Sequence, residues 1–199
     1  MDVVLTDDEI AAVALARHLA WPVPFATVAT DVEHLAAAAA RGRRSLLVRG
    51  LATPTDAGVD IAADVAGVLE QAVASRNVMA WVASIDNPAV IAGSSIVIYR
   101  SPAGDLIDLT SAIGIHSFRS VRPADWEAIV VATAKNVFDF GFFGPDDSST
   151  RLLVGRFGEA SLLLVSVGKV EAATWGSAGL EVRSESTDWS PLLIGRALL

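Results

Sequence analysis

The chain holds three histidines and no cysteine, so imidazole is the most versatile catalytic side chain that it offers. His18 and His34 fall within predicted helices, and neither has a partner at the H-x-x-x-H spacing that binds zinc on one helix face. His116 precedes Ser117, and a Ser–His hydrolase is one hypothesis for this pair. Because no G-x-S-x-G nucleophile elbow accompanies it, we expect packing or surface histidines and no catalytic residue.

Carboxylates gather at Asp7-Asp8-Glu9 and at Asp146-Asp147. Neither cluster has the spacing of an EF-hand loop or of paired catalytic carboxylates. The first cluster follows Thr6 as helix-capping residues do, and the second lies in a loop with glycine and proline. The chain also lacks a glycine-rich phosphate-binding motif ahead of a helix. The sequence therefore predicts no metal site and no cofactor.

The one basic cluster comprises Arg41, Arg43, Arg44 and Arg49 on a predicted helix. Such a segment is typical of a winged-helix DNA-binding regulator, which is the alternative function for this chain. However, the formal net charge is −8, and contacts to phosphates need a broad basic face. We therefore expect these arginines to form a solvated face, and nucleic-acid binding is the less favoured hypothesis.

Four of the seven phenylalanines lie between Phe138 and Phe143, in a glycine-containing loop that runs on to Asp147. Two interpretations stay open for these rings. They anchor the loop in the core, or they are exposed and bind a partner, because aromatic anchors dominate the energetics of interfaces. The candidate partner-binding residues are Phe140, Phe142 and Phe143.

Length and composition describe a folded protein. The 199 residues are 52% hydrophobic and 19% charged, which excludes a disordered chain and suits one domain. The apolar stretch 35–40 and the strand-sized run 161–167 are both far shorter than the roughly 20 residues that span a bilayer. The start of the sequence is acidic and lacks the basic region of a signal peptide. We expect a cytoplasmic protein without a membrane segment.

The period of the apolar residues changes from 3.6 to 2 near residue 75, which predicts an α+β fold. Residues 1–75 are expected to be mainly helical, with helices that start at Thr6, Asp31 and Asp60. Short segments bounded by turn residues predict strands at 78–85, 94–100, 106–110, 113–121, 151–157, 161–167, 169–175 and 180–184. A helix is expected over 123–137, and a final helix or strand over 188–199. Tight turns between the strands predict a mostly antiparallel sheet flanked by helices.

The later parts of this single expected domain (1–199), residues 76–137 and 138–199, resemble each other. Each holds a hairpin, 96–109 in the first and 152–165 in the second, and each contains an Asp-Trp pair ahead of an apolar stretch. Chance similarity between two hairpins explains this equally well. If the repeat is real, the sheet has pseudo-twofold halves.

The segment from Ala36 to Leu69 resembles the EspG family, the cytosolic chaperones of actinobacterial type VII secretion. A helix ends in an L-x-x-R-G-L phrase at Leu46 to Leu51, and an acidic-apolar helix from Asp60 follows a short turn. A strand with a tryptophan (Val78 to Ala83), a β-meander and the helix over 123–137 continue the family's order of elements. The family's quasi-twofold halves agree with the internal repeat.

This resemblance implies a non-catalytic binding protein. Members of the EspG family hold the hydrophobic helical tip of a secreted protein pair and keep it soluble. The implied partner is therefore a hydrophobic helical secretion substrate, and no cofactor takes part. The family's motifs carry no functional residue that transfers to a position of this chain.

Overall fold

The computed structural model describes residues 2–20, 28, 31–56, 58–84, 91–101, 104–111, 113–125, 128–129, 150–156, 161–166, 169–176 and 179–186. The chain forms two compact units. The first unit comprises Met1–Ser75 and Tyr99–Ser120, and the second comprises Arg76–Ile98 and Val121–Leu199.

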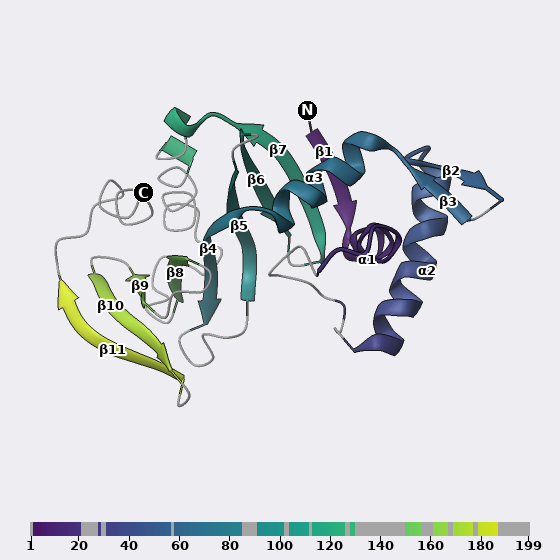
Figure 1. Cartoon of the computed structure of the whole chain (residues 1–199). Coiled ribbons are helices and arrows are strands. Elements are labelled where there is room, and N and C mark those ends of the chain that lie inside the picture. The colour runs from purple at the N-terminus through teal and green to yellow at the C-terminus, as the bar shows by residue number, and fades with distance from the viewer. Residues whose placement is uncertain are drawn as a thin grey trace. The chain divides into compact units, whose positions relative to one another are not determined.

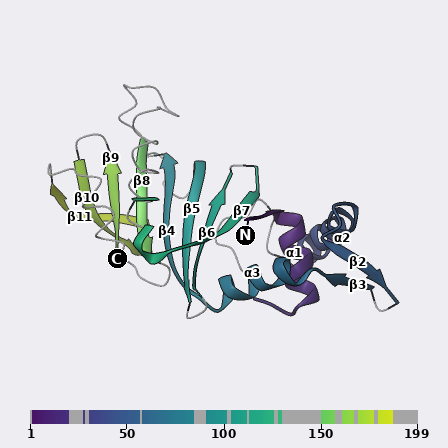
Figure 2. The ribbon, with the colours of Figure 1, turned by 90° about the horizontal axis from the view of Figure 1, so that it is seen from above.

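The first unit combines three helices with one side of an antiparallel sheet. Strand β1 pairs with β7 so that Leu5 lies opposite His116, and the strand order from this edge is β1-β7-β6-β5. Both ribbon views place α1, α2 and a small two-stranded sheet on the side of the unit where β1 lies, whereas α3 runs across the strands and contacts β6 as well as β1 (Figures 1 and 2). The elements are β1 (Asp2–Thr6), α1 (Asp7–Ala16), α2 (Val32–Val48), β2 (Ala52–Thr55), β3 (Gly58–Ile61), α3 (Ala63–Val73), β5 (Ile91–Ser101, from Tyr99 on), β6 (Gly104–Thr110) and β7 (Ile115–Val121).

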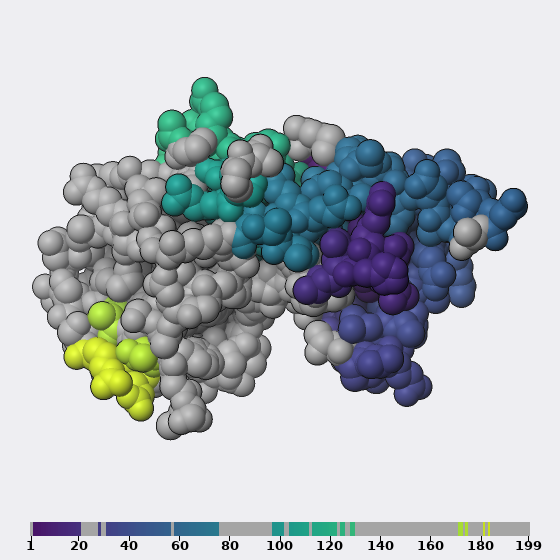
Figure 3. Space-filling model, viewed as in Figure 1, coloured from purple at the N-terminus to yellow at the C-terminus, as the bar shows by residue number. Residues whose placement is uncertain are grey.

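Helix α1 supplies much of the core of this unit. All five residues from Ile10 to Ala14 are buried, because the helix is apolar around most of its circumference and packs on several sides. Leu46 of α2 and Leu69 of α3 are also fully buried. In the space-filling view the purple surface of α1 adjoins the blue surface of α2 (Figure 3).

The second unit is an antiparallel meander. Its strand order is β4-β8-β9-β10-β11, and the described pairings of these strands are all antiparallel. The register between β10 and β11 shifts between Ala172 and Ala173, where Arg183 is the extra residue of a bulge in β11. The elements are β4 (Arg76–Ser84), the first part of β5, the 3₁₀ helix η1 (Pro123–Asp125), β8 (Thr150–Arg156), β9 (Ser161–Ser166), β10 (Lys169–Gly176) and β11 (Gly179–Ser186).

The predicted α+β fold with antiparallel strands flanked by helices is confirmed. Thr6 caps α1 and forms a capping box with Glu9, and Asp31 caps α2, as the sequence indicated. Helix α2 continues through Gly42. The eight predicted strands all form, with ends within about three residues of those expected.

The structure differs locally from the prediction in one helix start and in a strand that was not expected. The helix expected from Asp60 begins at Ala63, because Asp60 and Ile61 instead belong to β3 and pair with Thr53 and Ala52 of β2. The strand β1 was not anticipated, although its residues alternate between buried (Val3, Leu5) and exposed faces. Pro123 starts a short 3₁₀ helix over Pro123–Asp125.

Several predictions lie outside the described residues. These are the phenylalanine loop 138–147, most of the helix expected over 123–137 and the final element over 188–199. The tryptophans of the two Asp-Trp pairs are also outside that part of the chain. The pseudo-twofold repeat and the organisation as a single domain with three parts stay predictions.

Candidate functional site

The first candidate site is the start of α1, where three consecutive acids occupy the first turn. Each acid reaches a different partner: Asp7 contacts His116, Asp8 contacts Arg41, and Glu9 contacts Arg49. The positive end of the helix dipole favours acids at this position. Two of the three, Asp7 and Glu9, are nevertheless buried, which requires polar partners for their carboxylates.

Glu9 is fully buried and its carboxylate accepts three hydrogen bonds. One oxygen accepts from Ser45 Oγ at 2.6 Å, and the other from Arg49 at 2.6 Å and from the backbone N–H of Thr6 at 2.9 Å. Arg49 also donates to the carbonyl oxygen of Val4 at 2.9 Å. Arg49 therefore joins the end of α2 to both β1 and α1.

Asp8 and Arg41 form a second, more exposed pair. Two guanidinium nitrogens donate to the two oxygens of Asp8 at 2.7 and 2.8 Å, a bidentate geometry. The hydrogen bonds that Arg41 donates to Asp8 raise the pKa of Arg41, and the charge of Asp8 adds to this effect. This pair contributes less to stability than the Glu9 cluster, because water competes for both of its groups.

These pairs form because α1 and α2 touch through their backbones at Gly42. A Cβ added to Gly42 would lie 1.8 Å from the carbonyl oxygen of Asp8 and 2.8 Å from the nitrogen of Glu9. Arg41, Ser45 and Arg49 recur every four residues, so they share the face of α2 that meets α1. The missing side chain of Gly42 allows α1 and α2 to approach closely, and the four-residue spacing on α2 determines which of its side chains meet the acids of α1.

His116 of β7 is fully buried between two carboxylates. Its Nδ1 lies 2.8 Å from Asp108 Oδ2, and its Nε2 lies 3.0 Å from Asp7 Oδ1. Burial lowers the pKa of His116, but the hydrogen bonds with Asp108 and Asp7 outweigh it and raise the pKa to about 9. Both ring nitrogens therefore donate, and the residue is an imidazolium at neutral pH.

This arrangement contradicts the hydrolase hypothesis. Adjacent residues of a strand point to opposite faces, so Ser117 does not face the imidazole of His116. A general base also needs a free nitrogen, and both are occupied by carboxylates. His116 instead stacks on Phe118, with ring centroids 5.9 Å apart, and joins α1 to β6 and β7.

Asp108 is fully buried, and its second oxygen, Oδ1, has no hydrogen-bond partner in the described part of the chain. Burial raises the pKa of Tyr99 well above its usual value, and the charge of Asp108 adds to this effect. Among the described residues, no group of three or more histidines and acids could hold a metal ion.

All four arginines of the basic cluster are exposed, as expected for a solvated face. Two of them, Arg41 and Arg49, also pair with acids of α1, whereas Arg43 and Arg44 have no such contact among the described residues. The hairpin β2–β3 follows α2 as a wing would, but its exposed side chains include Asp56 and Asp60. Carboxylates there repel phosphates, so the geometry weighs against the DNA-binding alternative.

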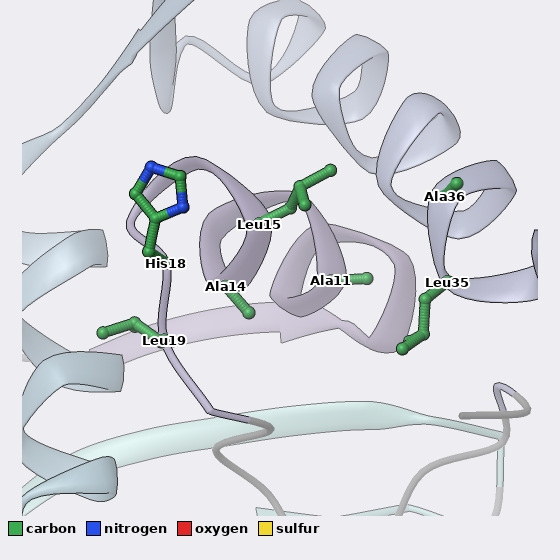
Figure 4. A pocket seen from close by; sticks show the side chains of 7 residues that line it. All are labelled: Ala11, Ala14, Leu15, His18, Leu19, Leu35 and Ala36. Carbon is green, nitrogen blue, oxygen red and sulfur yellow. The ribbon is translucent and has the colours of Figure 1, made fainter. Parts of the chain in front are cut away.

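A pocket of about 320 Å³ lies between the end of α1 and the start of α2. Its described lining is apolar except for one imidazole (Figure 4). The lining residues are Ala11, Ala14, Leu15, His18, Leu19, Leu35 and Ala36. The volume is within the range of small-molecule sites.

His18 was predicted inside a helix, but it lies just beyond the end of α1. The N–H of Leu19 donates to Ala14 at 2.9 Å and that of His18 to Leu15 at 3.4 Å, which is a Schellman motif. This motif needs a left-handed residue, usually glycine, and here His18 has a φ of 53°. Such a conformation costs a non-glycine residue roughly 1–2 kcal/mol. His34 is exposed in the first turn of α2 and bonds to Asp31.

The candidate partner-binding residues Phe140, Phe142 and Phe143 lie outside the described residues. The structure does bring together two sets of residues that the sequence interpretation treated separately, the acids of α1 and the arginines of α2. No helix in the described ranges is long and apolar enough to cross a membrane.

Neither a family model nor a curated protein matches this sequence. The fold is similar to that of the type VII secretion system chaperone EspG5 of Mycobacterium tuberculosis, whose structure was determined in complex with the PE25–PPE41 dimer. The TM-score is 0.52 and the sequence identity 11%, over 100% of this chain and 94% of that chain. At this identity the similarity shows a shared fold, which is the fold that the L-x-x-R-G-L phrase implied.

Proposed function

We propose that this chain is a non-catalytic, chaperone-like protein that binds a hydrophobic helical segment of a secreted protein in the cytoplasm. The observation that carries the proposal is the fold similarity, which extends over the whole chain to a chaperone determined with a protein dimer bound. The resemblance of residues 36–69 to the EspG family is a second, sequence-based argument for the same role.

The chemistry of the described residues is consistent with binding rather than turnover. The buried imidazole of His116 has both nitrogens engaged, and the buried carboxylate of Glu9 accepts three hydrogen bonds. These groups fix the fold of the first unit. A protein that shields an apolar segment works through buried area and needs no titrating residue.

For the contact surface, the proposal takes Phe140, Phe142 and Phe143. Their rings are the largest apolar side chains within a short, glycine-containing segment. Burying one phenylalanine side chain against a partner contributes roughly 1.5–3 kcal/mol. Three such rings would supply a large part of the affinity of an interface.

The test is affinity capture of the tagged full chain from its native cells, followed by mass spectrometry and reconstitution of the purified pair. We expect a secreted, predominantly helical protein that co-elutes with the chain in a fixed ratio and aggregates without it. Recovery of no stoichiometric partner would contradict the proposal.

The double variant Phe142→Ala/Phe143→Ala tests the contact surface with the same reconstituted pair. We expect partner affinity to fall about tenfold or more, which is about 1.4 kcal/mol, with little change in Tm. If the rings anchor the core instead, each substitution costs about 3–5 kcal/mol in stability and Tm falls steeply. That result would remove these residues from the interface without affecting the capture experiment.

A further inference from the structure

The pocket between α1 and α2 has the size and lining of a small-ligand site. A dry apolar cavity of about 150 Å³ takes benzene, so one of about 320 Å³ has room for roughly ten non-hydrogen atoms. Ala11, Ala14 and Ala36 expose only methyl groups to it, which leaves the volume open. Leu15 at the rim is 55% exposed. The floor and rim of the pocket thus favour an aliphatic or aromatic group.

His18 supplies the one hydrogen-bonding side chain of the described lining (Figure 4). It occupies the left-handed position that glycine fills at least cost, with a φ of 53°. Its imidazole makes no hydrogen bond or ion pair to the residues that the structure describes. Strain at a non-glycine residue beside a pocket is a common mark of a binding site.

The charged residues nearest to the pocket along the chain are of both signs. Arg17 precedes His18, and its contact to Glu70 is long at 4.0 Å. At the start of α2, Asp31 is bonded to His34 at 2.7 Å. Glu33 lies three residues before Ala36, so it adjoins the face of α2 that lines the pocket. An acidic head group therefore belongs at the α1 end of the pocket, where the imidazole of His18 can donate to it.

We infer that this pocket binds a small amphiphile of roughly ten non-hydrogen atoms, with an apolar chain and one carboxylate, whose head group accepts a hydrogen bond from His18. The apolar part lies against the alanines of α1 and α2. This site is independent of the protein-binding function proposed above, and either can fail without the other.

The test is calorimetric titration of the full chain with octanoate and with octanol, which share a chain length but differ in the head group. We expect saturable one-to-one binding of both, with octanoate tighter by about tenfold because a hydrogen bond to a charged acceptor is the stronger. His18→Gly should weaken octanoate about tenfold and octanol less than about twofold, while Tm holds or rises. The control His34→Gln should change neither affinity.

A second pair of variants tests the apolar half of the site. Ala36 lines the pocket and its neighbour Ala37 does not, although both are exposed on α2. Ala36→Phe should abolish binding of both probes, and Ala37→Phe should leave it unchanged. Absence of saturable binding, equal effects of the two alanine variants, or equal loss of both probes in His18→Gly would each overturn the inference.

Discussion

At its first turn α1 carries three acids, and each is bonded to a side chain of another element. At its last turn it carries Leu15, which is mostly exposed, and after it the strained His18, with an open pocket beside them. The capping box is satisfied at one end, whereas at the other a histidine occupies a glycine position.

The contrast separates two uses of polar residues within one helix. Charges that are buried and fully bonded hold α1 against β7 and α2, and they have no capacity left to bind a ligand. A polar group that is strained and without such partners is the one available for recognition. Changes at the first turn should therefore affect stability, and changes at the last turn should affect binding.

The largest effect should come from Gly42, where the two helices touch. In Gly42→Ala the new Cβ meets the backbone of Asp8 at 1.8 Å, so α1 and α2 must separate and the Asp8 and Glu9 pairs break. We expect a loss of more than about 4 kcal/mol in the free energy of unfolding, measured by urea denaturation.

Gly67 of α3 provides the matched control. A Cβ there meets nothing within 4 Å, and the residue is exposed in a helix. Gly67→Ala should stabilise by about 0.8–1 kcal/mol through helix propensity. Similar losses in both variants would show that the close approach at Gly42 is not what matters.

The next effect distinguishes two arginines on one face of α2. Arg49→Gln leaves the fully buried Glu9 without its cation, which should cost about 3–5 kcal/mol in unfolding free energy. Arg41→Gln removes a pair whose groups both contact water, and should cost much less than Arg49→Gln. Denaturant unfolding of the two variants measures the difference, and equal costs would refute the ranking by burial.

The start of α1 could be predicted from the sequence, but the backbone conformation at its end could not. The capping box was visible because Thr6 and Glu9 are local and their spacing is specific. The left-handed His18 was not, because nothing in the residue type marks it as a substitute for glycine. The strands of the meanders were predicted because each is bounded by turn residues, whereas β2 and β3 have four residues each and Pro54 obscures their alternation.

The contacts of the first turn needed the structure for another reason. Glu9 and Arg49 are 40 residues apart, and sequence alone does not show which charges meet across such a distance. One signal was available, since Arg41, Ser45 and Arg49 share a helix face. A basic face on α2 and an acidic capping segment at the start of α1 are compatible with packing of these two helices, but they do not specify it.

The buried imidazolium makes the first turn sensitive to pH. The pKa of His116 is about 9 in the folded chain and near 6.5 when unfolded, so the folded state binds the proton more tightly. Its stabilising contribution is complete below about pH 6.5 and is lost as the pH rises through about 9. We expect unfolding free energy to fall by on the order of 3 kcal/mol between pH 6 and pH 10.

His116→Gln is the control for this titration. Glutamine stays neutral, so the variant should be less stable at pH 6 and should lose the slope between about pH 6.5 and 9. His18→Gln should keep the slope, because His18 is exposed and it is His116 that is bonded to Asp7 and Asp108. A slope that survives in His116→Gln would assign the pH dependence to other groups.

The smallest effect has the opposite sign and concerns the last turn of α1. His18→Gly removes the left-handed strain without touching a hydrogen bond of the described residues, so we expect stabilisation by about 1 kcal/mol. His18→Ala keeps the strain and removes the imidazole, and should be neutral. The Tm values of the two variants, measured by thermal unfolding, separate the effect of backbone strain from that of the imidazole. If both lower Tm, the imidazole contributes to the fold, and the last turn of α1 is then as structural as the first.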